Sequence, residues 1–190
     1  MQGDIDRVLI DAATIERRLA EVADRISEDL GALSADSPAH LTLVPILTGS
    51  IIFVSDLIRK LPLRMQIHLV SVHSYPGTST TSRGARIRRE LTSLPDSLEG
   101  AHVLVLDDIL DSGKTLSVVT DLIASRGPAS LRVCVLLRKR RPEAMKRHVD
   151  YVCFEVPDEF VVGYGLDFND YYRNLPDIVT LRPEVIKGEG

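Results

Sequence analysis

The stretch that decides the fold is Val103-Leu-Val-Leu-Asp107-Asp108-Ile-Leu-Asp111-Ser-Gly-Lys-Thr-Leu116. Its four leading apolar residues predict a buried strand of a parallel sheet. Two adjacent carboxylates follow, then a third acid and the small-residue turn Ser112-Gly113, which opens a helix at Lys114. Backbone N–H groups at such a turn and the positive end of the helix dipole attract an anion. The stretch therefore predicts a phosphate-binding site at the carboxyl end of a strand.

This stretch is not a nucleotide P-loop, because that motif requires a glycine five residues before Gly113, where this chain has Asp108. Carboxylates beside a phosphate repel it unless they face hydroxyl groups or a cation. A ribose diol accompanied by Mg²⁺ meets both conditions. The alternative is an acidic strand–helix loop without a ligand. The number of elements at compatible spacing favours the phosphate site.

The composition fits one folded domain. A chain of 190 residues with 44% hydrophobic residues can bury a continuous core. The formal net charge of −4 argues against a dedicated nucleic-acid-binding protein. Cys134 and Cys153 lie in strand-like triplets, which predicts buried free thiols in a reducing compartment. With neither a membrane-spanning apolar run nor a signal-peptide pattern, we expect a cytoplasmic protein that binds no membrane.

Apolar periodicity predicts alternating helices and strands along the chain. A helix is predicted after a candidate cap at Asp11, and Gly31 can end it; the apolar residues at helical spacing are Ile15, Leu19, Val22, Ile26 and Leu30. Residues 74–86 hold almost no large apolar side chain, which predicts a mobile loop. The alternation predicts a doubly wound parallel sheet of the α/β class, with its ligand site near a switch point. We expect strands at 41–47, 65–72, 102–106, 131–137, 151–155, 160–164 and 178–181, and helices at 51–61 and 114–125.

The stretch 103–116 closely resembles the phosphoribosyl-pyrophosphate motif of the type I phosphoribosyltransferases. The resemblance implies one phosphoribosyltransferase domain over residues 1–190. Its core spans about 35–140, and a base-binding hood is built from about 150–190 together with the amino-terminal segment. The family's hypoxanthine branch usually has Glu-Asp where this chain has Asp107-Asp108. The resemblance also implies that Asp111 is the catalytic acid/base and that the phosphoribosyl group and its 5′-phosphate are bound by Asp107, Asp108, Asp111, Ser112, Gly113, Lys114 and Thr115.

Two segments nearer the amino terminus also resemble this family. Leu47-Thr48-Gly49-Ser50 looks like the pyrophosphate loop of the hypoxanthine-guanine branch, which carries a cis bond between its first two residues. The resemblance places Thr48 and Gly49 on pyrophosphate, with Thr48 where lysine is common. Ser74-Tyr75 resembles the flexible lid that closes over the reacting centre and excludes water.

Two carboxyl-terminal segments, Leu136–Pro142 and Pro157–Arg173, resemble the base-binding hood of the hypoxanthine-guanine branch. By this resemblance Lys139 donates to the 6-oxo group of the purine and Phe160 stacks on the ring. The main chain of Val161 reads the base edge, and Arg173 contacts pyrophosphate. The resemblance further places Asp167 near the exocyclic position and the metal, so that the candidate Mg²⁺ ligands are Asp107, Asp108 and Asp167.

The function implied is purine salvage by a Mg²⁺-dependent pentosyltransferase. The enzyme would move the 5-phosphoribosyl group of phosphoribosyl pyrophosphate to N9 of hypoxanthine or guanine, giving IMP or GMP and pyrophosphate. The expected partners are these two substrates and further copies of the chain, as a homodimer or homotetramer. The choice between hypoxanthine, guanine and xanthine depends on pocket geometry and stays open at this point.

Two other functions compete with purine transfer. An RNA-binding regulator that senses phosphoribosyl pyrophosphate shares the fold and an Asp-Asp pair, but such a protein needs a strongly basic face, which the net charge of −4 does not favour. A transferase directed at xanthine or orotate keeps the same chemistry with another base. The purine-type hood argues for hypoxanthine and guanine over both.

Overall fold

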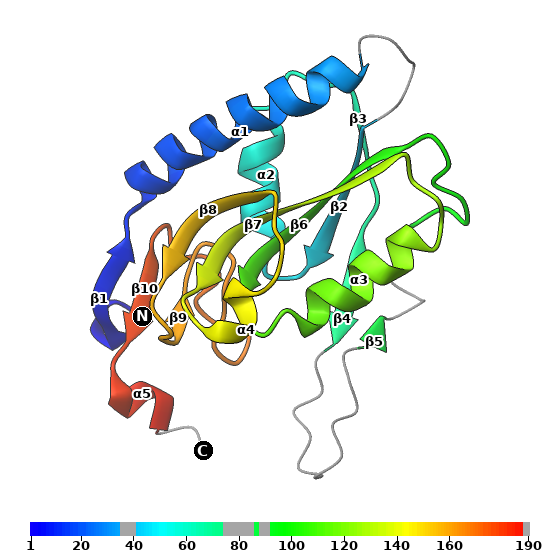
Figure 1. The fold of residues 1–190 in the computed structure, drawn as a ribbon. Helices are drawn as coiled ribbons and strands as arrows, with labels where there is room; N and C mark the ends of the chain where they lie inside the picture. The colour runs from blue at the N-terminus through cyan, green and yellow to red at the C-terminus, as the bar shows by residue number, and fades with distance from the viewer. Residues whose placement is uncertain (35–40, 74–85, 88–91, 188–190) are drawn as a thin grey trace.

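The computed structural model describes residues 1–34, 41–73, 86–87 and 92–187 (Figure 1). Within these ranges the chain forms two sheets and the helices that cover them. The predicted lid residues Ser74 and Tyr75 lie outside the described residues. In the described part of the chain, no helix is both long enough and apolar enough to cross a membrane.

The larger sheet consists of β2 (Leu41–Leu47), β3 (Met65–Ile67), β4 (Val70–His73), β5 (Arg86–Ile87), β6 (His102–Leu110), β7 (Ser130–Lys139) and β8 (Tyr151–Val156). Its seven strands follow the order β5-β4-β2-β6-β7-β8, with β3 paired to β2 beside this path. All pairs are parallel except β4–β5, which is antiparallel. The predicted parallel sheet is confirmed.

The order of strands creates a switch point between β2 and β6. From β2 the chain passes through α2 (Ile51–Ile58) to β4 on one side, whereas from β6 it passes through α3 (Lys114–Ala124) to β7 on the other side. β2 and β6 are neighbours, so their carboxyl ends open between two diverging connections. Ligands of open α/β sheets bind at such points.

Helices cover both faces of the larger sheet, so the fold is doubly wound (Figure 1). On one face lie α1 (Ala12–Ser34) and α2, and on the other lie α3 and the short α4 (Pro142–Met145). Because successive side chains of a strand point to opposite faces, Leu104 packs in the first core and Val105 in the second. Both side chains are fully buried.

The smaller sheet, which we call the hood, is antiparallel and joins the two ends of the chain. It contains β1 (Ile5–Ile10), β9 (Val161–Val162) and β10 (Ile178–Leu181) in the order β1-β10-β9, and the chain continues into α5 (Pro183–Lys187). Figure 1 shows β1 beside β10 at the left of the view, next to the tip of β8. The short 3-10 helix Gln2–Asp4 precedes β1. A small sheet built from both chain ends is confirmed, but β8 lies within the predicted range of about 150–190 and belongs to the larger sheet, so the bounds of a base-binding hood stay a prediction.

The amino-terminal helix begins where the sequence predicts and ends later. The Asp11 carboxylate accepts a hydrogen bond from the backbone N–H of Thr14 at 2.7 Å, and this bond lowers the pKa of Asp11. The helix then passes through Gly31 to Ser34. The prediction that Gly31 ends the helix was wrong, because this glycine lacks the positive φ that such a stop requires.

Strand β6 is longer than the predicted range 102–106. It continues to Leu110 because Asp107 and Ile109 keep pairing with Val135 and Leu137 of β7. The acidic pair is therefore held by the sheet itself. Conversely, the predicted strand at 160–164 shrinks to Val161–Val162, because positive φ angles at Gly163 and Tyr164 turn the chain out of the strand.

Two further boundaries differ from the prediction for local reasons. The helix predicted at 51–61 ends at Ile58, since Lys60 and Leu61 bond three residues back in the tighter turn that precedes Pro62. The strand predicted at 65–72 is divided into β3 and β4. At the break, Ser93 bonds both the His68 ring and the Leu69 N–H.

The two-sided burial of β6 predicts a large stability cost for truncation. Leu104→Ala should lower the free energy of unfolding by about 2–5 kcal/mol, because it leaves a cavity in a packed core. Urea denaturation at fixed protein concentration measures this. Ile67→Ala is the matched control: Ile67 lies on β3 and is 42% exposed, so its loss should cost much less. Equal losses in the two variants would contradict the two-sided core.

Candidate active site

A cavity of about 400 Å³ opens at the switch point, at the carboxyl ends of β2 and β6. Most of the predicted site residues line it, although they come from four separate segments of the chain. These are Thr48, Gly49, Asp107, Asp108, Asp111, Ser112, Gly113, Lys114, Thr115, Asp167 and Arg173. The fold therefore brings together residues that the sequence connected only by resemblance.

A buried carboxylate, Asp107, and a half-buried one, Asp108, form the acidic floor of this cavity. Asp107 is 5% exposed, and burial together with repulsion from Asp108 raises its pKa well above the usual range. Burial also raises the pKa of Asp108, although hydrogen bonds and the charge of Arg173 oppose that rise. Two neighbouring carboxylates withdrawn from water are costly unless a cation or hydroxyl groups neutralise or solvate them. The pair is therefore suited to a divalent cation or a ribose diol.

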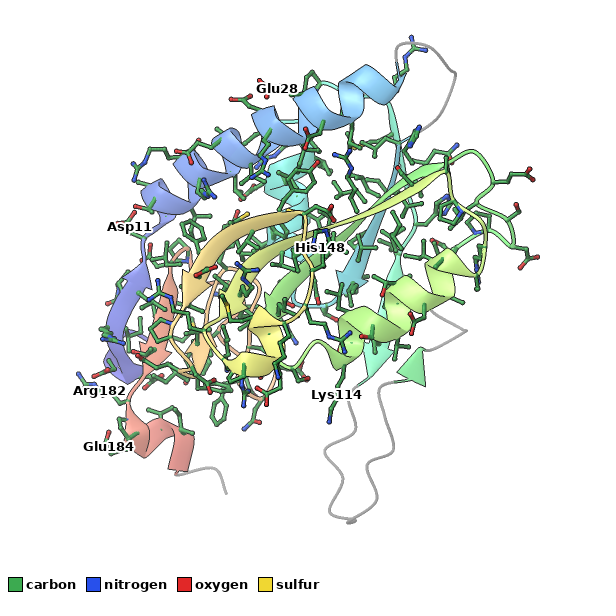
Figure 2. All side chains as sticks on the ribbon, in the orientation of Figure 1. Asp11, Glu28, Lys114, His148, Arg182 and Glu184 are labelled. Atoms are coloured by element: carbon green, nitrogen blue, oxygen red, sulfur yellow. The ribbon has the colours of Figure 1, made fainter. Side chains whose placement is uncertain are left out.

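The turn at 111–113, which is the predicted anion site, leads directly into α3. Gly113 has φ 73°, a conformation that favours glycine, and it places the first N–H groups of α3 toward the cavity. These N–H groups have no carbonyl partner within the helix. The Lys114 side chain is exposed and extends away from the sheet at the start of α3 (Figure 2). Backbone groups, more than this side chain, form the concave part of the anion site.

The loop after β2 packs tightly against the acidic pair. The Leu47–Thr48 peptide bond is cis, as the resemblance to the pyrophosphate loop implies. A Cβ atom added to Gly49 would lie 1.6 Å from Oδ2 of Asp108, so any other residue there would force the Asp108 carboxylate or the loop to shift. On its other side the Gly49 carbonyl lies against Gly165, where an added Cβ would come within 2.1 Å of that oxygen. The loop is thus held between β6 and the segment that follows β9.

Arg173 connects this segment to the cavity. Its Nη1 donates to the Gly165 carbonyl at 2.9 Å and lies 2.8 Å from Oδ1 of Asp167, while Nη2 donates to Asp170 at 2.9 Å. The second Asp167 oxygen accepts from the backbone N–H of Asp170 at 3.0 Å. Both oxygens of Asp167 therefore have partners in the protein. Its assignment as a metal ligand stays a prediction.

The remaining predicted residues lie toward the hood. Lys139 ends β7 with its side chain 12% exposed, and its Nζ lies 3.7 Å from Oδ2 of Asp111. The Phe160 side chain is 46% exposed and meets Phe168 edge to face, with the ring centroids 5.6 Å apart. Val161 pairs with Thr180 in the hood. An aromatic ring this exposed at the edge of a site offers a face for stacking.

Sequence reasoning missed three residues that shape this site: Arg141, Asp158 and Gly165. Arg141 donates a hydrogen bond to Oδ1 of Asp111, and its Nε lies 3.5 Å from Oδ2 of Asp158. The Asp158 carboxylate also lies 3.5 Å from Nζ of Lys139. All three residues stand within the segments that resemble the hood. Their contacts depend on tertiary approach, which no local pattern reveals.

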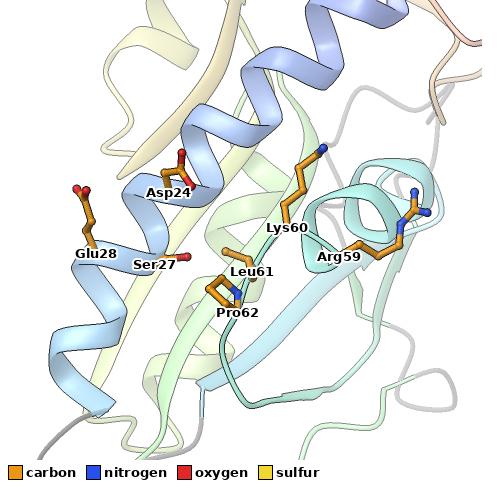
Figure 3. Close-up of a pocket in the computed structure, with 7 residues that line it drawn as sticks. All are labelled: Asp24, Ser27, Glu28, Arg59, Lys60, Leu61 and Pro62. Carbon is orange, nitrogen blue, oxygen red and sulfur yellow. The ribbon is translucent and has the colours of Figure 1, made fainter.

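Other hollows of the structure lie outside this constellation. One of about 450 Å³ lies between α1 and the end of α2 and is lined by Asp24, Ser27, Glu28, Arg59, Lys60, Leu61 and Pro62 (Figure 3). None of the predicted site residues is among these seven. A larger one of about 570 Å³ between α1, α2 and the segment 173–176 shares only Arg173 with the predicted site. The chemistry-bearing residues therefore point to the switch-point cavity.

The contact at Gly49 predicts a specific loss of substrate binding. In Gly49→Ala the added methyl must displace the Asp108 carboxylate or the loop, so the apparent KM for phosphoribosyl pyrophosphate should rise at least about tenfold. Steady-state kinetics with varied phosphoribosyl pyrophosphate measures this. Gly31→Ala is the control, because its Cβ would meet Leu63 at an ordinary 3.9 Å within α1. An unchanged KM in Gly49→Ala would contradict the close approach.

Comparison with known proteins agrees with this geometry. Residues 9–169 match the phosphoribosyl transferase domain family. The chain is 44% identical over 185 residues to the hypoxanthine-guanine phosphoribosyltransferase of Mycobacterium tuberculosis, covering 96% of this chain and 89% of that one. It is 37% identical to the hypoxanthine phosphoribosyltransferase of Escherichia coli, covering 90% and 92% of the two chains.

Among solved structures, a hypoxanthine phosphoribosyltransferase of Trypanosoma cruzi superposes with a TM-score of 0.88 at 37% identity, covering 98% of this chain and 96% of that one. Its Staphylococcus aureus counterpart gives a TM-score of 0.84 at 38% identity, covering 97% and 96%. Sequence and fold therefore agree over nearly the whole chain. They show that this protein belongs to the phosphoribosyltransferase family, within its group of hypoxanthine-guanine phosphoribosyltransferases.

Proposed function

We propose that the switch-point cavity and the adjoining hood form the site at which this enzyme transfers the 5-phosphoribosyl group of phosphoribosyl pyrophosphate to N9 of hypoxanthine or guanine. As a member of its group the protein is a purine-salvage phosphoribosyltransferase that forms IMP or GMP. Its relative from Trypanosoma cruzi has been solved in complex with IMP. We infer the roles of individual residues in this transfer from their positions and charges.

The observation that carries the assignment is the pairing of Lys139 with Asp111. A donor and an acceptor lie 3.7 Å apart here, at the ends of two neighbouring strands and beside the anion-binding turn. O6 and N7 lie side by side on one edge of a 6-oxopurine. Lys139 can donate to O6, and the Asp111 carboxylate can accept a hydrogen from N7. This edge of the base therefore matches the two side chains in position and in polarity.

The positions of these groups define the course of the reaction. As the bond between ribose carbon 1 and pyrophosphate breaks, N9 forms the new bond to carbon 1 and the proton on N7 passes to Asp111. A carboxylate placed for such a transfer contributes about 10²–10⁴ to the rate. The turn at 111–115 holds the 5′-phosphate, Arg173 faces the departing pyrophosphate, and Phe160 stacks on the base.

Mg²⁺ is the cofactor that fits the acidic floor. Asp107 and Asp108 offer hard oxygen ligands. Their pKa values are raised because burial destabilises the charged carboxylates, and a bound cation would offset that destabilisation. Among the described residues no group of three His, Cys, Asp or Glu side chains converges on one point. Such a site suits Mg²⁺, which commonly takes only one or two carboxylates and draws its other ligands from phosphates and water. Bound there, Mg²⁺ would neutralise pyrophosphate as the leaving group.

We also propose a homodimer or homotetramer in the cytoplasm. Next to the pyrophosphate loop, α2 exposes Ile51 and Ile52, which are 49% and 36% accessible, and a second copy of the chain would cover this apolar surface. The oligomeric state of the Trypanosoma cruzi relative has been studied in its own right. Cys134 and Cys153 are buried free thiols, which suits a reducing compartment.

A panel of bases tests the assignment of the base site. With phosphoribosyl pyrophosphate and Mg²⁺, we expect transfer to hypoxanthine and guanine and little to adenine, because a 6-amino group presents hydrogens to the Lys139 ammonium. A buried polar group left unpaired costs about 1–3 kcal/mol. Lys139→Ala should raise the KM for both accepted purines and barely change that for phosphoribosyl pyrophosphate. Xanthine, uracil and orotate complete the panel, and excess chelator should abolish activity until Mg²⁺ is restored.

Two results of this panel would overturn the assignment. Equal use of adenine and hypoxanthine would show that Lys139 does not select the 6-oxo group. Full activity in excess chelator would remove the metal from the reaction. A gel-shift assay with RNA, run beside the panel, tests the regulatory alternative directly.

The role of Asp111 is tested by Asp111→Asn. The amide keeps the size of the side chain but cannot accept the N7 proton, so turnover should fall by about 10²–10⁴. Affinity for phosphoribosyl pyrophosphate, measured by calorimetry, should stay within a few-fold of wild type because the turn backbone is unchanged. Turnover near that of wild type would mean that another group takes the proton.

A further inference from the structure

Arg141 lies at a structurally fixed point beside Asp111. It is the residue before α4, with an extended backbone followed by Pro142 at the first helical position. Its N–H donates to the Lys139 carbonyl at 2.8 Å, and its carbonyl accepts from Met145 at 3.0 Å. The backbone that carries the guanidinium is therefore held in place by hydrogen bonds, and a residue that positions another side chain needs such support.

This guanidinium is one of four charged side chains that form a closed ring. Asp111 and Asp158 each face both Lys139 and Arg141, so two carboxylates and two cations alternate. The Nε of Arg141 is buried without a hydrogen-bond partner and also lies 3.7 Å from Glu143 on α4. The hydrogen bond to Asp111 raises the pKa of Arg141, so the guanidinium stays charged at working pH.

Within this ring the two carboxylate oxygens of Asp111 face different partners. Oδ1 accepts from Arg141, while Oδ2 faces Lys139 at 3.7 Å, a separation longer than a hydrogen bond. That separation leaves Oδ2 and the Lys139 ammonium each able to bond the base. Without Arg141, the Asp111 carboxylate is free to turn and pair directly with Lys139, and the donor and acceptor that the base needs would then satisfy each other.

We propose that Arg141 is a positioning residue for the transfer reaction: it holds one oxygen of Asp111 so that the other faces N7 of the purine, and with Asp158 it keeps the Asp111–Lys139 ion pair from closing into a direct hydrogen bond. This inference rests on the proposed role of Asp111. Arg141 itself touches no substrate. It acts through Asp111, and Asp158 holds both cations in place.

The test is a comparison of Arg141→Gln, Arg141→Lys and Arg140→Gln. Arg141→Gln should lower kcat/KM for hypoxanthine by about 10–100-fold, because misplacing a reacting group by about 1 Å costs this much. The KM for phosphoribosyl pyrophosphate should stay within about twofold, since the anion turn is untouched. Arg141→Lys should restore part of the loss, as an ammonium can reach one Asp111 oxygen but lacks the fork that also faces Asp158.

Arg140→Gln is the matched control, since Arg140 is the adjacent arginine. Its side chain is 64% exposed and its ion pair runs to Glu155 on β8, at 3.8 Å, so the variant should behave like wild type. Melting temperatures of all three variants should lie close to that of wild type. A loss in Arg140→Gln equal to that in Arg141→Gln would overturn the proposal, because the effect would then be one of general charge.

A double-mutant cycle with Asp111→Asn separates this inference from the assignment of Asp111. If Arg141 acts through Asp111, Arg141→Gln should have little further effect in the Asp111→Asn background. Additive losses, with Asp111→Asn itself strongly impaired, would overturn the role of Arg141 alone. A fully active Asp111→Asn would overturn the catalytic assignment and this inference together.

Discussion

The close approach of the β2 loop to the Asp108 carboxylate is the constraint on which the rest of the site depends. Gly49 has no room for a side chain on the Asp108 side, and its carbonyl leaves none for a side chain at Gly165. The β2 loop therefore packs against the Asp108 side chain on one side and against the backbone of the segment after β9 on the other. Close packing of this kind transmits any displacement of one segment to the others. The acidic floor, the loop after β2 and the segment that carries Arg173 consequently depend on one another for their positions.

The two halves of the site differ in how their charges are balanced. The floor under the predicted ribose contains an acidic pair whose burial raises both pKa values. The base side contains an alternating ring of two cations and two carboxylates, which neutralise one another before any ligand binds. A bound cation would therefore stabilise the acidic floor, whereas the ring already balances its own charges and depends only on the positions of its side chains. The two halves should respond differently to metal and to substitutions.

Residue spacing alone predicted only the contiguous part of the site, and the separate segments were connected to it by resemblance. The strand, acidic pair and anion turn stand within residues 103–116, so their spacing alone indicates the chemistry. Strand β10 also had its predicted bounds, because its apolar run is short and clearly delimited. The contact of Arg141 with Asp111 joins residues 30 positions apart, and only the pairing of β6 with β7 brings them together. The sequence also did not predict that β6 continues through the acidic pair to Leu110, because charged residues rarely indicate a buried strand.

The pairing of strands within the hood affects the order in which parts of the protein fold during synthesis. Residues 5–10 pair with residues 178–181, so β1 can enter its sheet only after β10 has been synthesised. The larger sheet, with the acidic pair and the predicted anion turn, is complete once β8 has been made, whereas the hood still lacks β10, and contacts between distant parts of a chain form late. The proposed phosphoribosyl half of the site can therefore fold before the proposed base side.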